Sequence, residues 1–315
     1  MSKDFNSLPG GKVYSALMDA ESILLAANPR FNLGILEGIF QASKDLDTIV
    51  IFELARSECD LKGGYTGLTP ETFANNVRST AKKIDYPYFV IHGDHIKVQK
   101  NTEEVIKSTK KLIKNQIENG YTSFAIDASF LFNIEAETTY EQLEDNIKAT
   151  TELAHFIKDN VAIDDYGLEV EVGEIGKMDE NGLVYTTVDE AVTFIKALNE
   201  NDVHPNFLAI ANGSTHGNIY NDKGEPIEQI TIDIPRTKEI AKAIEKFGVR
   251  IAQHGITGTP LDLIEEHFPK GLIGKGNVGT YWQNIVWDVL KTNEVEIFSK
   301  IKDWVLEKYR PTHPK

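Results

Sequence analysis

The sequence is poor in cysteine and in long apolar stretches. Cys59 is the only cysteine among 315 residues, so no disulfide can form within the chain. No apolar run approaches the roughly 18 residues of a membrane span, and the N-terminal "MSKDFNSLPGGKVYS" contains no apolar signal core. These absences predict a soluble, globular protein of the cytoplasm.

Positive charge is also scarce. The chain has 33 Lys and Arg residues against 48 Asp and Glu residues, a net charge of −15, with no block rich in Lys or Arg. Nucleic acids and anionic membranes bind basic patches, so neither is expected as a partner. There is no low-complexity tract and no long linker rich in Pro, Gly or Ser, and 41% of the residues are hydrophobic. We therefore expect a single domain over residues 1–315 with a substantial core.

Eight short apolar runs alternate with segments of helical periodicity. The runs begin at Ser22, Asp47, Tyr88, Ser123, Tyr166, Asn206, Val249 and Gly271. Their nearly continuous apolar character is typical of parallel strands covered on both faces. Eight strand–helix units predict an α/β fold, a closed (β/α)₈ TIM barrel, with a doubly wound open sheet as the alternative. Two helical segments follow Thr280, and the second, in residues 294–315, is expected to be a C-terminal helical extension that covers a neighbour or the barrel edge.

Polar residues collect where the predicted strands end, and in a barrel the carboxyl ends of the strands form the active-site face. They are His92, Asp94, His95, Asp127, Ser129, Glu169, Glu171, His216, His254 and Asn277. Three imidazoles with an open coordination position are typical of a catalytic divalent metal site, most simply Zn²⁺. Gly217 and Gly255 directly follow two of the histidines, and glycine allows the sharp turns and close approach that a ligand site needs.

The third histidine of such a site has two candidates. On an extended chain His92 and Asp94 share one face of the strand and His95 lies on the other, so both histidines cannot bind one metal without a turn. Asp94 is a candidate acid–base group, because a nearby cation favours its charged form. Glu169 and Glu171 also share a face, and the alternative to a site role is a polar layer inside the barrel.

Six motifs resemble those of class II fructose-bisphosphate aldolases, in the same order, from Phe31 to Thr280. They are "VIHGDH", "GYTSFAIDAS", "YGLEVEVGEIG", "GLVYTTVDEAVTFIKAL", "LAIANGSTHGNIY" and "IAQHGITG". Each motif is weak alone, but six in register are highly specific. The family is a metal-dependent (β/α)₈ barrel that makes or cleaves ketose bisphosphates, usually as a dimer or larger homo-oligomer. The resemblance implies reversible cleavage of a ketose (bis)phosphate, such as fructose 1,6-bisphosphate, to dihydroxyacetone phosphate and glyceraldehyde 3-phosphate.

The resemblance also implies roles for individual residues. The metal residues are His95, His216 and His254 as zinc ligands, Glu171 as an alternate ligand, and Asp127 near a second metal or cation position. This assignment selects His95 over His92. Asp94 matches the residue that exchanges a proton with the C4 hydroxyl, and Asp179 or Glu180 is the candidate loop acid for the C1 proton. Asn32 matches an asparagine near the triose carbonyl.

The sequence departs from the family where phosphate is bound. The family's "GGS" is Gly255-Ile256-Thr257, its "NIDT" is Asn277-Val278-Gly279-Thr280, and the lysine after "HGxY" is Asn221. Arg56 is new in the loop after the second strand, and a guanidinium can bind phosphate through two parallel hydrogen bonds. We expect it to bind a substrate phosphate, with a surface ion pair as the alternative. The expected substrate contacts are Asn32, Arg56, Gly217, Gly255, Thr257, Asn277 and Thr280.

A second resemblance leaves the reaction open. "GGYTGLTPETF", at residues 63–73, is similar to a motif of the accessory subunit of tagatose-bisphosphate aldolase. The alternatives to an aldolase are therefore a sugar-phosphate epimerase that uses the same metal and enediolate, or a non-catalytic subunit that stabilises a true aldolase. The presence of Asp94 and of all three ligand histidines argues against the non-catalytic subunit.

Overall fold

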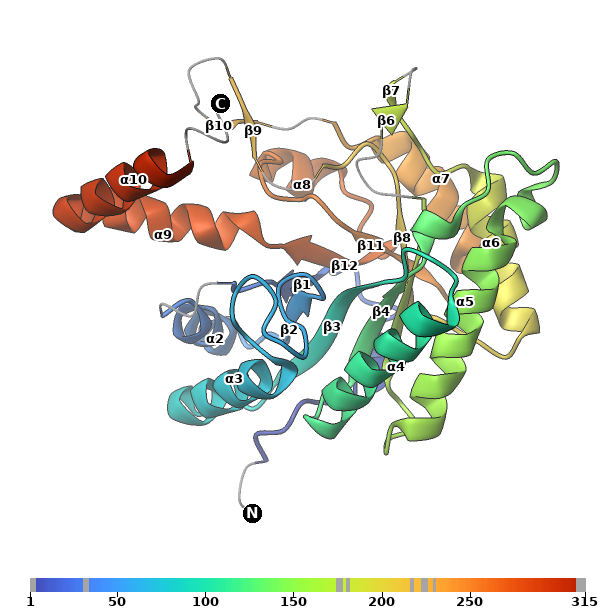
Figure 1. Cartoon of the computed structure of the whole chain (residues 1–315), viewed down its shortest axis with the longest axis horizontal. Helices are drawn as coiled ribbons and strands as arrows, with labels where there is room; N and C mark the ends of the chain where they lie inside the picture. Colours follow the sequence, from blue (N-terminus) through green and yellow to red (C-terminus); the bar gives the residue numbers. More distant parts are fainter. Residues whose placement is uncertain are drawn as a thin grey trace.

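The computed structural model describes residues 4–30, 34–173, 178–179, 182–215, 218–221, 226–228 and 231–309. Eight parallel strands close into a barrel in the order β1-β12-β11-β8-β5-β4-β3-β2 (Figure 1). They are β1 (Leu24–Ala27), β2 (Val50–Ala55), β3 (Phe89–Lys97), β4 (Ser123–Asp127), β5 (Gly167–Val172), β8 (Phe207–Ile210), β11 (Arg250–Gln253) and β12 (Ile273–Val278). Each of the eight predicted runs overlaps one barrel strand, so the TIM barrel is confirmed and the open sheet is wrong.

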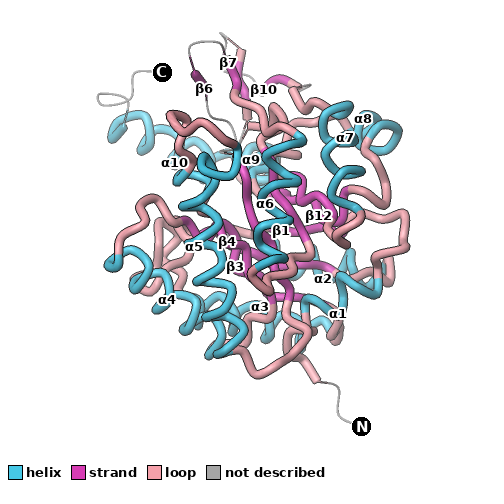
Figure 2. Tube along the Cα trace, turned by 90° about the vertical axis from the view of Figure 1, so that its right-hand side faces the viewer, coloured by secondary structure: helices cyan, strands magenta, loops and turns pink. Residues whose placement is uncertain are grey.

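Helices surround this barrel, as Figure 2 shows. In chain order they are α2 (Ile35–Asp45), α3 (Pro70–Ile84), α4 (Glu103–Glu118), α5 (Thr139–Asn160), α6 (Val188–Glu200), α7 (Ile234–Glu245) and α8 (Leu261–His267), and α9 (Thr280–Asn293) follows the last strand. Thr69, Thr138 and Thr187 begin three of them with capping boxes, in which the threonine and the residue three positions on bond each other's backbone N–H. These local signals explain why the helix starts are readable from the sequence.

Three smaller elements were not predicted. Helix α1 (Gly10–Ala16) packs against β3 and β5 before the first strand. The two-stranded hairpins β6–β7 (Met178–Asp179 and Gly182–Leu183) and β9–β10 (Ile219–Tyr220 and Pro226–Ile227) lie in the loops after β5 and β8. Both hairpins lie at the top of Figure 1, above the carboxyl ends of the strands. They therefore belong to the loops of the expected active-site face.

Side chains inside the barrel change from apolar to polar or charged along strands such as β2 and β3. Because alternate residues of a strand point inward, Ile51 of β2 is followed inward by Glu53. Val90 of β3 is followed by His92, and the register pairs Ile51 with Val90 and Glu53 with His92. The apolar interior cluster also contains Phe207, and it lies toward the amino ends of the strands. The charged layer above it forms the floor of the active-site face.

The end of the chain leaves the barrel. Helices α9 and α10 (Val295–Tyr309) form a hairpin that projects away from the strands (Figure 1). None of their residues, all described, is buried. The predicted extension therefore packs on α9, and in the described residues it does not cover the barrel edge. None of the described helices is long and apolar enough to cross a membrane.

Candidate active site

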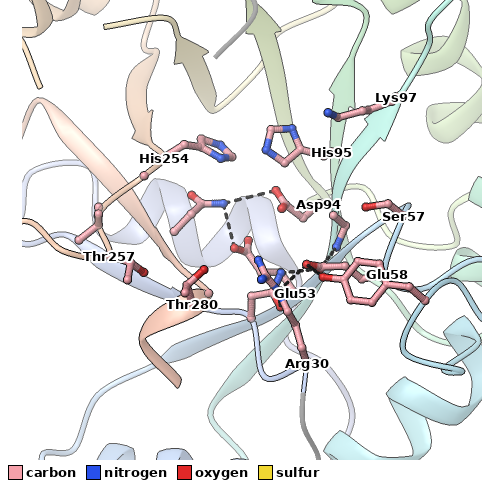
Figure 3. Close-up of a pocket in the computed structure, with 17 residues that line it drawn as sticks. Arg30, Glu53, Ser57, Glu58, Asp94, His95, Lys97, His254, Thr257 and Thr280 are labelled. Atoms are coloured by element: carbon pink, nitrogen blue, oxygen red, sulfur yellow. Dashed lines mark hydrogen bonds and ion pairs between the residues drawn. The ribbon is translucent and has the colours of Figure 1, made fainter. Parts of the chain in front are cut away.

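A cavity of about 250 Å³ opens at the carboxyl ends of the strands (Figure 3). Strands β2, β3 and β12 and the segments that follow β1 and β11 supply its walls. The predicted site residues that line it are Asp94, His95, His254, Gly255, Thr257, Asn277 and Thr280. The cavity therefore collects, from three separate strand ends, residues that the sequence assigned to metal binding, proton transfer and substrate contact.

A bulge in β3 places Asp94 and His95 on the same side. The pairing of β3 with β4 shifts between Gly93 and Ile96, and His95 has a positive φ of 40°. A regular strand would turn these neighbours to opposite faces, but an extra residue in a bulge re-aims one side chain. Both residues line the cavity, whereas His92 lies deeper in the barrel and bonds Ser123 at 2.7 Å through Nδ1.

His254 lies beside His95 and has a carboxylate behind it. The ring centroids of the two histidines are 4.5 Å apart, and His254 Nε2 lies 3.1 Å from Glu169 Oε1. Metal-binding histidines usually donate their second ring N–H to a carboxylate in this way, which fixes the tautomer. Gly255, with φ of 67°, follows directly, and a Cβ there would come within 2.6 Å of the Thr215 carbonyl oxygen. Glycine is therefore required at this turn.

His95 also faces two carboxylates on the next strands. Its Nδ1 lies 3.0 Å from Glu171 Oε2 and 3.3 Å from Asp127 Oδ2, while Ser129 Oγ donates to Asp127 Oδ1 at 2.7 Å. Burial lowers the pKa of His95, but Asp94 and Glu171 outweigh burial and raise it well above its usual value. Burial and the charge of Asp127 raise the pKa of Glu171 to about 7. A cation at this position would compensate the clustered negative charge.

The donor set fits a divalent metal. One ligand atom from each of Asp94, His95 and His254 lies within 4.8 Å of the others, and the same holds for His95, Asp127 and Glu171. Imidazole nitrogens with carboxylate oxygens suit Zn²⁺, and the second carboxylate group provides an adjacent cation position. His216 lies outside the described residues, so the geometry of the full histidine triad is not part of this description.

The side-chain amide of Asn277 holds Asp94 and bridges it to a second carboxylate, that of Glu53. Asn277 Nδ2 donates to Glu53 Oε1 at 2.8 Å and to Asp94 Oδ1 at 3.3 Å. Burial and the charge of Asp94 raise the pKa of Glu53 to about 8. Burial acts in the same direction on Asp94, but His95 and Lys275 outweigh it and lower the pKa of this carboxyl. Asp94 is thus the ionised member of a pair of cavity carboxylates, as a general base must be.

A buried lysine balances the charge below the cavity. Lys275 is fully buried, and its Nζ lies 2.6 Å from Glu169 Oε2, 3.2 Å from Glu53 Oε2 and 3.1 Å from His92 Nε2. Burial lowers the pKa of Lys275, yet Glu169 and Glu53 outweigh burial and raise it. Burial and the Lys275 charge lower the pKa of His92, which keeps this imidazole neutral. Lys275 therefore serves as the buried countercharge of Glu53 and Glu169.

A second network shapes the wall formed after β1 and β2. Glu58 is buried, and its Oε2 accepts from Asn28 Nδ2 at 2.6 Å and from the Ala55 N–H at 2.7 Å. Its Oε1 accepts from Tyr65 OH at 2.9 Å and forms an ion pair of 2.5 Å with Arg30 Nε. This network gives Tyr65 of the "GGYTG" motif a structural role, because the carboxylate of Glu58 fixes both Tyr65 and Arg30 at the cavity. The alternation of β2 could have revealed Glu53, but nothing local to the sequence pointed to Arg30.

Arg56 does not line the cavity, which corrects the expected role of this residue. Its guanidinium donates to the Lys97 carbonyl oxygen at 3.0 Å and to Thr109 Oγ1 at 2.9 Å, and its Nε lies 3.5 Å from Asp60. The side chain therefore ties the loop after β2 to β3, through the Lys97 carbonyl, and to α4, through Thr109. Two other cations line the cavity: Arg30 and Lys97.

Some predicted site residues lie outside the description. Asn32, Glu180, His216 and Gly217 are not among the described residues. Asp179 belongs to β6, but only its backbone is described. Their assignments stay predictions from the sequence.

Comparison with known proteins identifies the family of the chain. Residues 16–312 match the family model described as fructose-bisphosphate aldolase class-II. A D-tagatose-1,6-bisphosphate aldolase subunit GatZ of Escherichia coli K12 is 25% identical over 101 residues, which are 30% of this chain and 24% of that protein. The chain therefore spans about a quarter of the length of this curated relative.

Two solved structures show the same fold. A fructose-bisphosphate aldolase from Campylobacter jejuni superposes with a TM-score of 0.65 at 19% identity, covering 92% of this chain and 81% of that one. The fructuronate-tagaturonate epimerase UxaE from Cohnella laeviribosi superposes with a TM-score of 0.65 at 11% identity, covering 92% and 64%. At these identities the structures support the fold, and the family rests on the model that matches nearly the whole sequence. The chain belongs to the class II fructose-bisphosphate aldolase family.

Proposed function

We propose that this protein is a metal-dependent class II aldolase of the cytoplasm. It reversibly cleaves the C3–C4 bond of a ketose (bis)phosphate, such as fructose 1,6-bisphosphate, to dihydroxyacetone phosphate and glyceraldehyde 3-phosphate. The observation that carries the proposal is the bulge in β3, which presents Asp94 and His95 together beside His254 in one cavity. An acid–base carboxylate directly next to a metal donor set is the arrangement that aldol cleavage requires. The chain acts as a homodimer or larger homo-oligomer.

The predicted site residues have separate roles in this proposal. His95, His254 and His216 would hold Zn²⁺, with Glu171 as an alternate ligand and Asp127 at a second cation position. When bound, the metal supplies a Lewis acid that polarises the ketose carbonyl. Asp94 takes the C4 hydroxyl proton as the C3–C4 bond breaks and the aldehyde leaves. Asn277 orients Asp94, and Asp179 or Glu180 returns a proton to C1 of the remaining triose.

The proposal predicts that activity depends on the metal. Treating the purified full-length protein with a chelator should abolish cleavage of fructose 1,6-bisphosphate, and Zn²⁺ should restore it. Elemental analysis should find about one tightly bound divalent metal per chain before treatment. His254→Ala should lose metal and activity together. Full activity in a preparation shown to be free of metal would contradict the proposal.

Arg30 and Lys97 are proposed to bind the anionic groups of the substrate. They lie on opposite sides of the cavity in Figure 3, at the ends of β1 and β3. Glu58 holds Arg30 through Nε, and a Cβ at Gly279 would come within 2.8 Å of Arg30 Nη2, so glycine leaves space at this edge. A guanidinium fixed at one edge can bind a phosphate through the other. Thr257 and Thr280 add hydroxyl groups to the same cavity.

Replacing Arg30 by Ala should raise KM for a phosphorylated ketose by roughly 10–100-fold, the equivalent of losing one charge-assisted hydrogen bond. The metal content and the fold should stay unchanged. Arg78→Ala is the matched control, because this guanidinium bonds Asn119 and Asn75 and does not line the cavity. Steady-state kinetics with a panel of ketose mono- and bisphosphates measures both variants. An equal KM in both variants and the wild type would exclude Arg30 as a phosphate ligand.

A sugar-phosphate epimerase is the second candidate. The observation that favours it is the pair of carboxylates, Asp94 and Glu53, joined through Asn277 in the same cavity. Epimerisation needs a proton removed and returned, and two carboxyls of different pKa suit these two steps. NMR analysis of the products distinguishes the reactions, because only cleavage releases an aldehyde that can be trapped. A protein with bound metal that performs neither reaction would support the non-catalytic subunit.

A further inference from the structure

A second pocket lies beside the catalytic cavity. It has a volume of about 390 Å³, and the loops after β2 and β3 and the first turns of α4 form its walls. Ser57 and Lys97 line both this pocket and the catalytic cavity, so the two spaces are adjacent. In Figure 3 these two residues mark the edge of the cavity that lies opposite Thr257. The volume is within the range of small-molecule sites in proteins.

The second pocket gathers positive charge in an acidic protein. Arg56, Lys97 and Lys100 line it, and Asp60 is the acid among its lining residues. The chain as a whole has a net charge of −15, so three cations beside one acid run against its composition. A cleft lined mainly by one sign of charge raises the local concentration of ligands of the opposite sign. The pocket therefore favours an anion.

Arg56 is held in this pocket by neutral oxygen atoms, which do not cancel its charge. Its Nη1 donates to the Lys97 carbonyl oxygen and to Thr109 Oγ1, and its Nη2 donates to Ser108 Oγ at 3.3 Å. Its countercharge is Asp60, which lies 3.5 Å from Nε and whose side chain is 36% exposed, so this ion pair is weak. A guanidinium has five N–H groups, and one N–H of Nη2 remains for a ligand. The arginine is therefore already ordered for binding.

Other donors of the second pocket have no partner in the part of the chain that is described. Ser57 Oγ, the Gln99 amide and the Lys100 ammonium bond no described residue, and all three residues are exposed. Hydroxyl and ammonium groups beside a fixed guanidinium are donors with which proteins bind phosphate. A phosphate group presents three strong acceptor oxygens, so it can use several of these donors at once.

We propose that the second pocket binds a phosphate group and that Lys97 links its occupancy to the catalytic cavity. Arg30, Thr257 and Thr280 line the cavity and not this pocket, so its phosphate is additional to the groups that they would contact. Lys97 borders both spaces, and a phosphate in the pocket attracts its ammonium away from the cavity. Two molecules can supply the phosphate: a substrate long enough to extend past Ser57, or a free phosphate ester. Only the link to turnover rests on the proposed function.

Isothermal titration calorimetry of the full-length protein with inorganic phosphate tests the site. Arg56→Ala should weaken phosphate binding by roughly 10-fold or more, the usual effect of losing a charge-assisted hydrogen bond. Lys100→Glu, at an exposed position, should also weaken it, and this variant keeps the test valid if Arg56→Ala does not fold. Arg78→Ala is the matched control, because its guanidinium bonds Asn119 and Asn75 and lines neither space.

Arg30→Ala separates the second pocket from the catalytic cavity. Phosphate binding that falls with Arg56→Ala and Lys100→Glu but not with Arg30→Ala supports the proposal. If phosphate occupies both spaces, the Arg30 and Arg56 variants should each remove a different binding event, which also supports it. A wild type that binds no phosphate, or binding that falls only with Arg30→Ala, would overturn it. These measurements need no turnover, so they stand apart from the test of the aldolase reaction.

Repeating the titration with saturating fructose 1,6-bisphosphate distinguishes the two sources of phosphate. The Asp94→Asn variant is used here, because it should bind the ketose and consume it slowly. If the substrate itself extends into the second pocket, inorganic phosphate should no longer bind there. If a separate ester is the ligand, phosphate should still bind, and it should raise KM of the wild type more than KM of Lys100→Glu.

Discussion

Replacing Lys275 by Met is expected to lower the free energy of unfolding by about 3–5 kcal/mol, the usual effect of removing one partner from a buried ion pair. The ammonium of Lys275 is fully buried, and it is the cation that the carboxylates of Glu53 and Glu169 both contact. Without it, two buried carboxyls lose their countercharge, and a methionine side chain offers them no hydrogen bond. Urea unfolding followed by circular dichroism measures the change.

Two further variants show whether the loss comes from uncompensated charge. Adding Glu169→Gln to Lys275→Met removes one of the two stranded carboxylates and should recover part of the stability. Lys83→Met removes an ammonium from an ion pair with Glu37 that is largely exposed, and its unfolding curve should match the wild type. A Lys275→Met protein as stable as the Lys83→Met protein would mean that the lysine does not hold this layer together.

Replacing Asp94 by Asn is expected to reduce kcat for ketose cleavage by roughly 10²–10⁴-fold, the usual contribution of a positioned acid–base group. An amide has nearly the same shape as the carboxylate and still reaches Asn277, but it cannot take a proton from the C4 hydroxyl. The loss should therefore appear in kcat, and raising the substrate concentration should not overcome it. Stopped-assay measurement of aldehyde release gives kcat and KM separately.

The metal content of this variant decides between two roles. Asp94 lies with His95 and His254 in a group of potential ligands, so a protein that loses its metal with Asp94→Asn would show a ligand instead of a base. Retained metal with lost turnover supports proton transfer. Asp19→Asn is the control, because Asp19 is exposed before β1, at the other end of the barrel. Near-normal turnover with Asp94→Asn would exclude the assigned role.

The barrel could be read from the sequence because its signals are local. Each strand is a short apolar run, and threonine boxes such as the one at Thr187 mark helix starts within a few residues. The alternation within a strand also places Glu53 and His92 inside the barrel. The small hairpins after β5 and β8 were missed, because strands of two residues leave no periodic pattern.

The candidate site could be predicted only in part, for reasons that differ between residues. The position of His95 depends on a bulge, which strand alternation alone does not reveal. Arg56 follows the second strand closely, but its direction is set by acceptors on α4, more than 50 residues away in sequence. Arg30 reaches the cavity because Glu58 holds it, and this pairing exists only after β1 and β2 lie side by side.

The left-handed backbone at His95 also limits how this pocket can change during evolution or design. A positive φ is unfavourable for most side chains; glycine tolerates it best, and asparagine, aspartate and histidine are the side chains most often found there. Histidine therefore suits both the backbone and a metal site, whereas glycine would lose the imidazole and most larger side chains would strain the backbone. The backbone conformation and the metal-binding role each restrict which residues can occupy position 95, so a single substitution can seldom satisfy both requirements. A designer who wants new chemistry here has to rebuild Gly93–Ile96 as a unit, because the backbone of that segment sets the directions of both Asp94 and His95.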